Sequence, residues 1–197
     1  TRTTIAVILG LLILTSLALA YYQRDELRAE WNTKRKYFLL IEGVFLSFFL
    51  IDLFIRLGNS DLWHPAKGGE RPMDFSYFNA VLKSTSFPPY DPWFAGGHIN
   101  YYYYGFALIA TPVKLLGIVP SIAYNFILPT LFAMVSICAF SIGWNLLADK
   151  DDPSSTSNSQ QMVAGFVASF LTILLGNLGT IQLIYNRLQQ LGAAGTF

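Results

Sequence analysis

The chain has 197 residues, of which 53% are hydrophobic and 13% are charged, whereas an average soluble domain has roughly 25% charged residues. This composition excludes an ordinary soluble protein, and the formal net charge of +1 gives no electrostatic reason to expect nucleic acid as a partner. The single cysteine, Cys138, excludes a disulfide within the chain.

The first apolar stretch, 4–22, carries no charge and has the length of about 20 residues that one transmembrane helix needs. Five basic residues follow it within 24–36, against Arg2 before it, so the positive-inside rule places this downstream loop in the cytoplasm. The alternative is a secretory signal peptide, because Ala18-Leu19-Ala20 has the form that signal peptidase cleaves. We favour a membrane anchor that runs from outside to inside. The sequence opens on Thr1, as expected of a processed protein or a piece of a longer one.

Four further apolar stretches predict four more crossings, at 37–57, about 100–117, about 121–147 and about 162–185. The loop 58–98 then lies outside, the turn at 117–121 lies in the cytoplasm, and the net-acidic loop 148–161 lies outside. The sequence therefore predicts an all-α, polytopic protein of the cell membrane with about five transmembrane helices. We divide it into an anchor with its basic loop (1–36), a central region (37–145), and a polar loop with the last helix (146–197).

Charged residues interrupt the second apolar stretch at Glu42, Asp52 and Arg56, which fall on one side of a helix. A charge in hydrocarbon costs several kcal/mol, so this side is expected to face protein or a cavity. Asp52 and Arg56 can pair, since they are four residues apart. In the last stretch, Gly176 and Gly179 share a face that could admit a close neighbour, although glycine is common in membrane helices.

One short helix is predicted inside the long outer loop. Asp74 can cap a segment whose Phe75, Phe78 and Leu82 lie on one face, as in an amphipathic helix that rests in the membrane interface. The loop also gathers carboxylates among aromatic residues and histidines. Such carboxylates can bind a divalent cation or act as a general base, and the aromatic rings can stack on a sugar or lie along a lipid. The carboxylates and histidines are Asp61, His64, Glu70, Asp74, Asp91 and His98.

The segment from Trp63 to Phe106, WHPAKGGERPMDFSYFNAVLKSTSFPPYDPWFAGGHINYYYYGF, resembles the signature of the uncharacterised "YYY" family of bacterial and archaeal membrane proteins. That family is named for a tyrosine run, which is Tyr101 to Tyr104 here. The resemblance extends over about 37–145. The family is in turn similar in layout to the multi-spanning C-type glycosyltransferases, such as the protein mannosyltransferases, whose first outer loop carries an acidic motif followed by an amphipathic helix.

This resemblance implies that sugar is transferred from a polyprenyl-phosphate donor at the outer membrane face. It gives Asp74 the role of base or metal-linked carboxylate, with Glu70 as its acidic neighbour and a divalent cation as a cofactor. In those transferases the acidic pair is adjacent or one residue apart, and here the spacing is Glu70-x-x-x-Asp74. Candidate substrate-binding residues are Tyr90, Asp91, Trp93, His98, Asn100 and Tyr101.

Two other classes of function remain open. The chain can be a non-catalytic helical subunit of a larger membrane complex, with other membrane subunits as partners. It can also be a transporter, if Glu42, Asp52 and Arg56 line a polar path. The lipid bilayer is a partner in every case.

Overall fold

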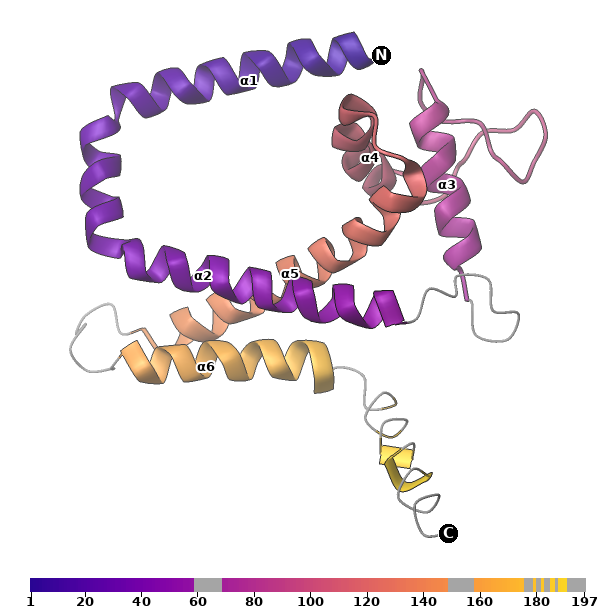
Figure 1. Ribbon diagram of the computed structural model, residues 1–197. Helices are drawn as coiled ribbons and strands as arrows, with labels where there is room; N and C mark the ends of the chain where they lie inside the picture. Colours follow the sequence, from indigo (N-terminus) through magenta and orange to yellow (C-terminus); the bar gives the residue numbers. More distant parts are fainter. Residues whose placement is uncertain are drawn as a thin grey trace. The chain divides into compact units, whose positions relative to one another are not determined.

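The computed structural model describes residues 1–58, 69–148 and 158–175, together with 179, 182, 185, 186 and 188–190. Within these residues the secondary structure is helical, and the β-type pairing is a single isolated bridge. The predicted all-α fold class is therefore confirmed. In chain order the helices are α1 (Arg2–Tyr22), α2 (Arg24–Gly58), α3 (Arg71–Lys83), α4 (Tyr104–Leu116), α5 (Pro120–Leu146) and α6 (Asn158–Phe170), followed by a π-helix at Leu171–Leu175 (Figure 1).

Three of the described helices, α1, α2 and α5, are long and apolar enough to cross a membrane. Two shorter apolar helices cover Tyr104–Leu116 and Ser159–Ile173. A helix of 13 residues such as α4 extends only about 20 Å, less than the roughly 30 Å of a hydrocarbon core. The multi-pass membrane character predicted from composition follows from the three long helices, whereas α4 by itself is too short for a complete crossing.

The basic segment 24–36, predicted as a loop, is the first part of α2. Only Gln23 separates α1 from α2, which then continues for 35 residues. No glycine or proline occurs between Arg24 and Glu42, and the Lys34 ammonium lies 2.9 Å from the Glu30 carboxylate, one helical turn earlier. Such pairs support an exposed helix, so the helix extends through the charged segment and its side chains remain exposed.

One compact unit comprises residues 1–38 and 52–128, and its core lies where α3, α4 and the start of α5 meet. Phe78 of α3 is fully buried, and its ring lies 6.2 Å from that of Tyr124 on α5. Phe75 meets the same Tyr124 ring edge-on at 5.3 Å. The apolar face predicted for the short helix therefore forms, and it packs against protein. The buried residues of this core are Phe78, Val81, Ala110, Val113, Ala123 and Tyr124.

The same unit corrects the predicted membrane topology. The Arg2 side chain donates to the carbonyl of Lys114 at 2.9 Å, and Arg56 donates to the side-chain oxygen of Asn125 at 2.9 Å. Arg2 and Arg56 were assigned to the outer side, and Lys114 and the turn before Asn125 to the inner side. Hydrogen-bonded groups cannot lie on opposite faces of a bilayer about 30 Å thick. The turn at Gly117 therefore lies at the same end of the helices as Arg2 and Arg56, and the assignment of Lys114 to the opposite face is wrong.

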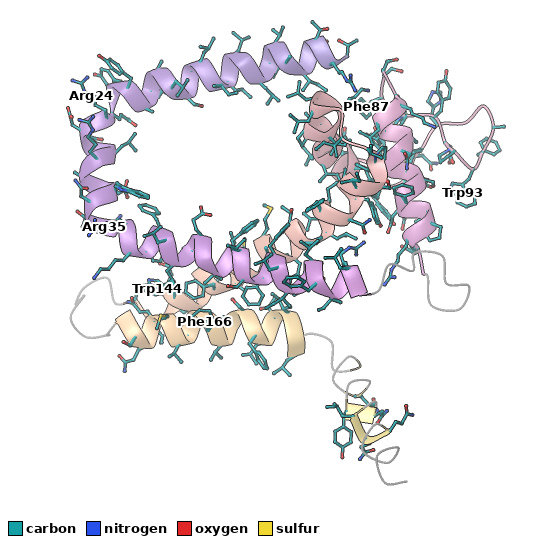
Figure 2. All side chains as sticks on the ribbon, viewed as in Figure 1. Arg24, Arg35, Phe87, Trp93, Trp144 and Phe166 are labelled. Atoms are coloured by element: carbon teal, nitrogen blue, oxygen red, sulfur yellow. The ribbon has the colours of Figure 1, made fainter. Side chains whose placement is uncertain are left out.

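A second compact unit comprises residues 39–51 and 129–197, of which the structure describes α5 and α6 in close contact. Ser169 of α6 donates to the carbonyl of Ser136 on α5 at 2.8 Å, and both residues are buried. The Phe166 ring lies 5.2 Å from that of Phe140. Figure 2 shows Trp144 and Phe166 where α5 and α6 lie side by side.

The predicted last helix, 162–185, corresponds to α6 and its π-helical extension to residue 175, and it begins four residues earlier than predicted. Residues 179, 182 and 185 are helical as well. Gly176 lies outside the described residues. Among the described residues, two helices approach closely at Gly143 and Gly165, where an added Cβ would meet the facing helix at 2.5 Å and 2.7 Å, respectively.

Candidate functional site

Two carboxylates and a phenol meet at the start of α3. Glu70 is the residue directly before the helix, and Asp74 lies one turn later, with its backbone N–H donating to the Glu70 carbonyl at 2.9 Å. The Tyr102 hydroxyl lies 3.3 Å from Oε2 of Glu70 and 3.3 Å from Oδ1 of Asp74. The sequence-predicted acidic pair is therefore brought together, and we name Glu70, Asp74 and Tyr102 the acidic site.

Asp74 does not cap α3, contrary to the role predicted for it from the sequence. Glu70 occupies the capping position and its side chain makes no capping hydrogen bond, while Arg71 and Pro72 open the helix. Pro72 needs no N–H partner in this first turn, which explains why the helix starts before Asp74. The carboxylate of Asp74 is therefore left to interact with Tyr102.

The surroundings of Asp74 change its affinity for protons. Partial burial raises the pKa of the Asp74 carboxyl above 3.8, the hydrogen bond from Tyr102 opposes this, and the nearby charge of Glu70 raises it further. Burial and the charges of Asp74 and Glu70 raise the pKa of Tyr102 to about 12. Tyr102 thus stays protonated at neutral pH and acts as a hydrogen-bond donor, and the Asp74 carboxyl holds a proton more tightly than a solvated aspartate.

The segment between α3 and α4 folds back on itself beside α3. The Ile99 N–H donates to the Pro89 carbonyl at 2.9 Å, and Asp91 N–H donates to the Gly97 carbonyl at 3.0 Å. At the turn, the Asp91 carboxylate accepts from the backbone N–H of Trp93 at 2.8 Å. The Trp93 indole N–H then donates to Ser76 of α3 at 2.8 Å, while two thirds of the residue stays exposed. Figure 2 labels Trp93 on the segment that follows α3. The segment is therefore fixed to α3 with aromatic faces turned outward.

The candidate substrate-binding residues fall into separate groups along α3. The Tyr101 ring is tilted by 53° against that of Tyr102, with ring centroids 4.1 Å apart, so Tyr101 lies beside the acidic site. Tyr90 stacks on His98 at 4.6 Å. Tyr90 and Asp91 line a hollow of about 250 Å³ at the other end of α3, together with Lys83. Asn100 is exposed. Asp61 and His64 lie outside the described residues.

The charged residues of α2 do not form one cluster. Arg56 is half-buried and bonds to Asn125, and the ion pairs found among the described residues do not include the one expected between Asp52 and Arg56. Glu42 lies on an exposed part of α2. That Glu42 faces protein stays a prediction, and a polar path through all three residues gains no support from their placement.

A divalent cation was expected at Asp74. Within the part of the chain that the structure describes, no three His, Cys, Asp or Glu side chains gather at one place. Mg²⁺ is commonly held by one or two carboxylates together with substrate phosphates and water. Glu70 and Asp74 fit this small donor set, with Tyr102 as a hydrogen-bond donor and not as a ligand.

Tyr102 is the functional candidate that sequence reasoning missed. Four consecutive tyrosines look alike in the sequence, and only Tyr101 was selected. Because α4 begins at Tyr104, residues 101–103 are not helical, and their backbone turns the Tyr102 side chain toward α3. The contact of Tyr102 with residues about thirty positions earlier is long-range, so no local pattern in the sequence singles Tyr102 out of the run.

The comparison with known proteins agrees with this account of a membrane-spanning chain. A family model described as "Uncharacterized membrane protein (DUF2298)" matches residues 1–196. The chain belongs to the DUF2298 family. No curated protein and no solved structure matches it.

Proposed function

We propose that this DUF2298 protein is the part of a membrane-embedded glycosyltransferase that carries its acidic site, and that it uses a sugar on a polyprenyl phosphate as donor. The observation that carries the proposal is the meeting of Glu70, Asp74 and Tyr102 at the start of α3. The similarity in layout to C-type glycosyltransferases supports it, because that similarity assigned the acidic role to Asp74 independently of any contact.

Transfer of the sugar forms one bond and breaks another. The acceptor hydroxyl oxygen forms a bond to the anomeric carbon, the bond from that carbon to the phosphate oxygen breaks, and polyprenyl phosphate leaves. Asp74 takes the proton of the attacking hydroxyl, for which its raised pKa makes it a better base than an ordinary aspartate. A divalent cation, when bound, neutralises charge on the leaving phosphate.

The surroundings of the acidic site suit a lipid-linked sugar. Trp93 and Phe94 expose about two thirds of their area beside α3, and Tyr101 exposes more than half. Aromatic faces stack on sugar rings, and Trp and Tyr are enriched at the membrane interface. A donor whose tail lies in the bilayer would present its phosphate at that depth.

The test compares transfer by the full-length protein in lipid nanodiscs from a panel of polyprenyl-phosphate sugars. Asp74→Asn should reduce kcat by about 10²–10⁴, the range that one positioned base contributes. The matched control is Asp25→Asn, which removes a carboxylate that pairs with Arg24 on the exposed surface of α2. Equal rates for wild type and Asp74→Asn would exclude Asp74 as the base, and absence of transfer across the panel would overturn the proposal.

One observation favours a second candidate, a helical subunit of a larger complex. Glu42 is exposed on an apolar stretch of α2, and such a charge is costly in lipid. A further protein element that covers Glu42 removes this cost. Cross-linking from a photoreactive residue at position 46, one turn along α2, decides between the candidates: products with a different polypeptide favour the subunit, and products within the same polypeptide favour the transferase.

A further inference from the structure

We propose that the first part of α2, residues 24–38, lies along the membrane surface and binds anionic phospholipid headgroups through one side of the helix. This inference is independent of the acidic site and of the activity proposed for it. The whole segment belongs to the first compact unit, as α1 does. We name the binding side the arginine face, and its residues are Arg24, Leu27, Arg28, Trp31, Arg35 and Phe38.

The end of α1 marks the depth at which this segment begins. α1 is long and apolar enough to cross a membrane, and its last two residues, Tyr21 and Tyr22, are strongly exposed. Exposed tyrosines at the end of such a helix are typical of the membrane–water interface. Only Gln23 separates α1 from α2, and Figure 1 shows α2 turning away from the line of α1 at this point. A charged helix that turns off a membrane-spanning helix at the interface follows the membrane surface.

The arginines and the apolar side chains of this segment share one side of the helix. At about 100° per residue, Arg24, Arg28 and Arg35 fall within an arc of about 40°. The three apolar residues of the arginine face fall within a neighbouring arc of about 40°. An anionic partner therefore meets three cations and no carboxylate on this face. The acidic residues of the segment lie outside both arcs, and they are Asp25, Glu26 and Glu30.

The arginine face is open to a ligand. Leu27 and Trp31 expose 46% and 51% of their area, and the Trp31 ring stacks on that of Phe38 with ring centroids 5.8 Å apart. Arg28 and Arg35 are exposed, and neither is part of an ion pair found among the described residues. Two guanidinium groups thus lie at the surface beside an exposed apolar patch.

This combination fits an anionic phospholipid. A guanidinium group can form two parallel hydrogen bonds with a phosphate, whereas an ammonium group acts as a point charge. The indole of Trp31 suits the depth of the headgroups, where its ring leaves water and its N–H stays near polar groups. The excess of basic residues after α1 places the segment at the cytoplasmic face, and anionic lipids are enriched in that leaflet. An acidic soluble protein would match the arginines but not their position at the end of a membrane-spanning helix.

The first test measures which phospholipid gathers beside the segment. The full-length protein carries a donor dye at Asn32→Cys, with its other cysteines, Cys138 included, replaced by serine. It is placed in nanodiscs of phosphatidylcholine with phosphatidylglycerol as the minor component. Energy transfer to acyl-labelled phosphatidylglycerol, compared with acyl-labelled phosphatidylcholine, gives the selectivity for the anionic lipid. The matched variants are Arg35→Gln and Lys36→Gln, which remove one positive charge at adjacent residues about 100° apart around the helix.

We expect the wild type to select phosphatidylglycerol, and Arg35→Gln to lower this selectivity by about fivefold, the gain that one basic residue makes at an anionic surface. Lys36→Gln should change it by less than about twofold, because Lys36 lies outside the arginine face. Equal losses in the two variants, or no selectivity in the wild type, would overturn the proposal. Helical circular dichroism and size-exclusion elution confirm that each variant is folded.

A second test locates the two sides of the helix without removing any charge. Nitroxide labels are placed at Leu27→Cys on the arginine face and at Thr33→Cys, about 120° away around the helix. We expect oxygen from the bilayer to reach the label at position 27 and a water-soluble nickel chelate to reach the label at position 33. If the nickel chelate reached both labels equally, the segment would stand in water and the proposal would fail. Shielding of position 27 from both reagents would show that protein covers the face in place of lipid, which would also overturn it.

Discussion

Replacing Gly143 by alanine tests the packing of α5 against α6. A Cβ at this position would lie 2.5 Å from the Ala164 carbonyl oxygen and 2.7 Å from the Ala168 Cβ. Ordinary carbon contacts begin near about 3.5 Å, so the helices must separate by up to about 1 Å. Overpacking of this kind costs about 1–3 kcal/mol, and helix propensity returns at most about 1 kcal/mol for Gly→Ala. We expect Gly143→Ala to lower the free energy of unfolding by about 1–2 kcal/mol.

The assay is unfolding in mixed detergent micelles, followed by helical circular dichroism. The matched control is Gly43→Ala on α2, where an added Cβ meets no atom within 4 Å. This control keeps the propensity gain and lacks the clash, so it should be neutral or slightly stabilising. If Gly143→Ala were as stable as Gly43→Ala, the close contact between α5 and α6 would be refuted.

Three further predictions concern the first compact unit. Asn125→Leu should lower the free energy of unfolding by about 1.5–3 kcal/mol, because the half-buried Arg56 loses its acceptor; an unchanged unfolding curve in detergent would contradict this. Trp93→Phe keeps an aromatic side chain but loses the indole N–H and its bond to Ser76, so hydrogen exchange within 89–99 should accelerate by about three- to tenfold, for a bond worth about 1 kcal/mol. With Cys138 replaced by serine, a cysteine at position 118 should react with an impermeant thiol reagent from the same membrane side as one at position 100; reaction from opposite sides would restore the topology predicted from the sequence.

The sequence predicts the fold class well because membrane helices are set by apolar length. It predicts α1 and α5 to within two residues, since charges or turn residues flank both stretches. It fails at Arg24 to Lys36, where a charged composition suggests a loop but the absence of glycine and proline allows α2 to continue. The sequence also predicts the wrong membrane side for Lys114. The positive-inside rule counts basic residues, and it cannot distinguish a helix that crosses the membrane from a short helix, such as α4, that packs on α3.

The acidic site was predictable in part. Glu70 and Asp74 are four residues apart at the start of a helix, so their proximity follows from helical geometry. The role of Tyr102 depends on where α4 begins, which decides the direction of each tyrosine in the run, and no periodicity in the sequence fixes that boundary. Tyr90 and His98 lie apart from Asp74 because the backbone of 89–99 pairs with itself, and no local pattern in the sequence predicts this pairing.

The central claim is that a lipid-linked sugar binds at the acidic site, and direct photo-cross-linking tests it. A polyprenyl-phosphate sugar with a photoreactive group on the sugar is bound to the full-length protein in nanodiscs, irradiated, and located by peptide mass spectrometry. We predict labelled peptides within 70–102 that unlabelled donor suppresses, with peptides of α6 unlabelled. Labelling of α6 alone, or labelling within 70–102 that unlabelled donor fails to suppress, would contradict the claim.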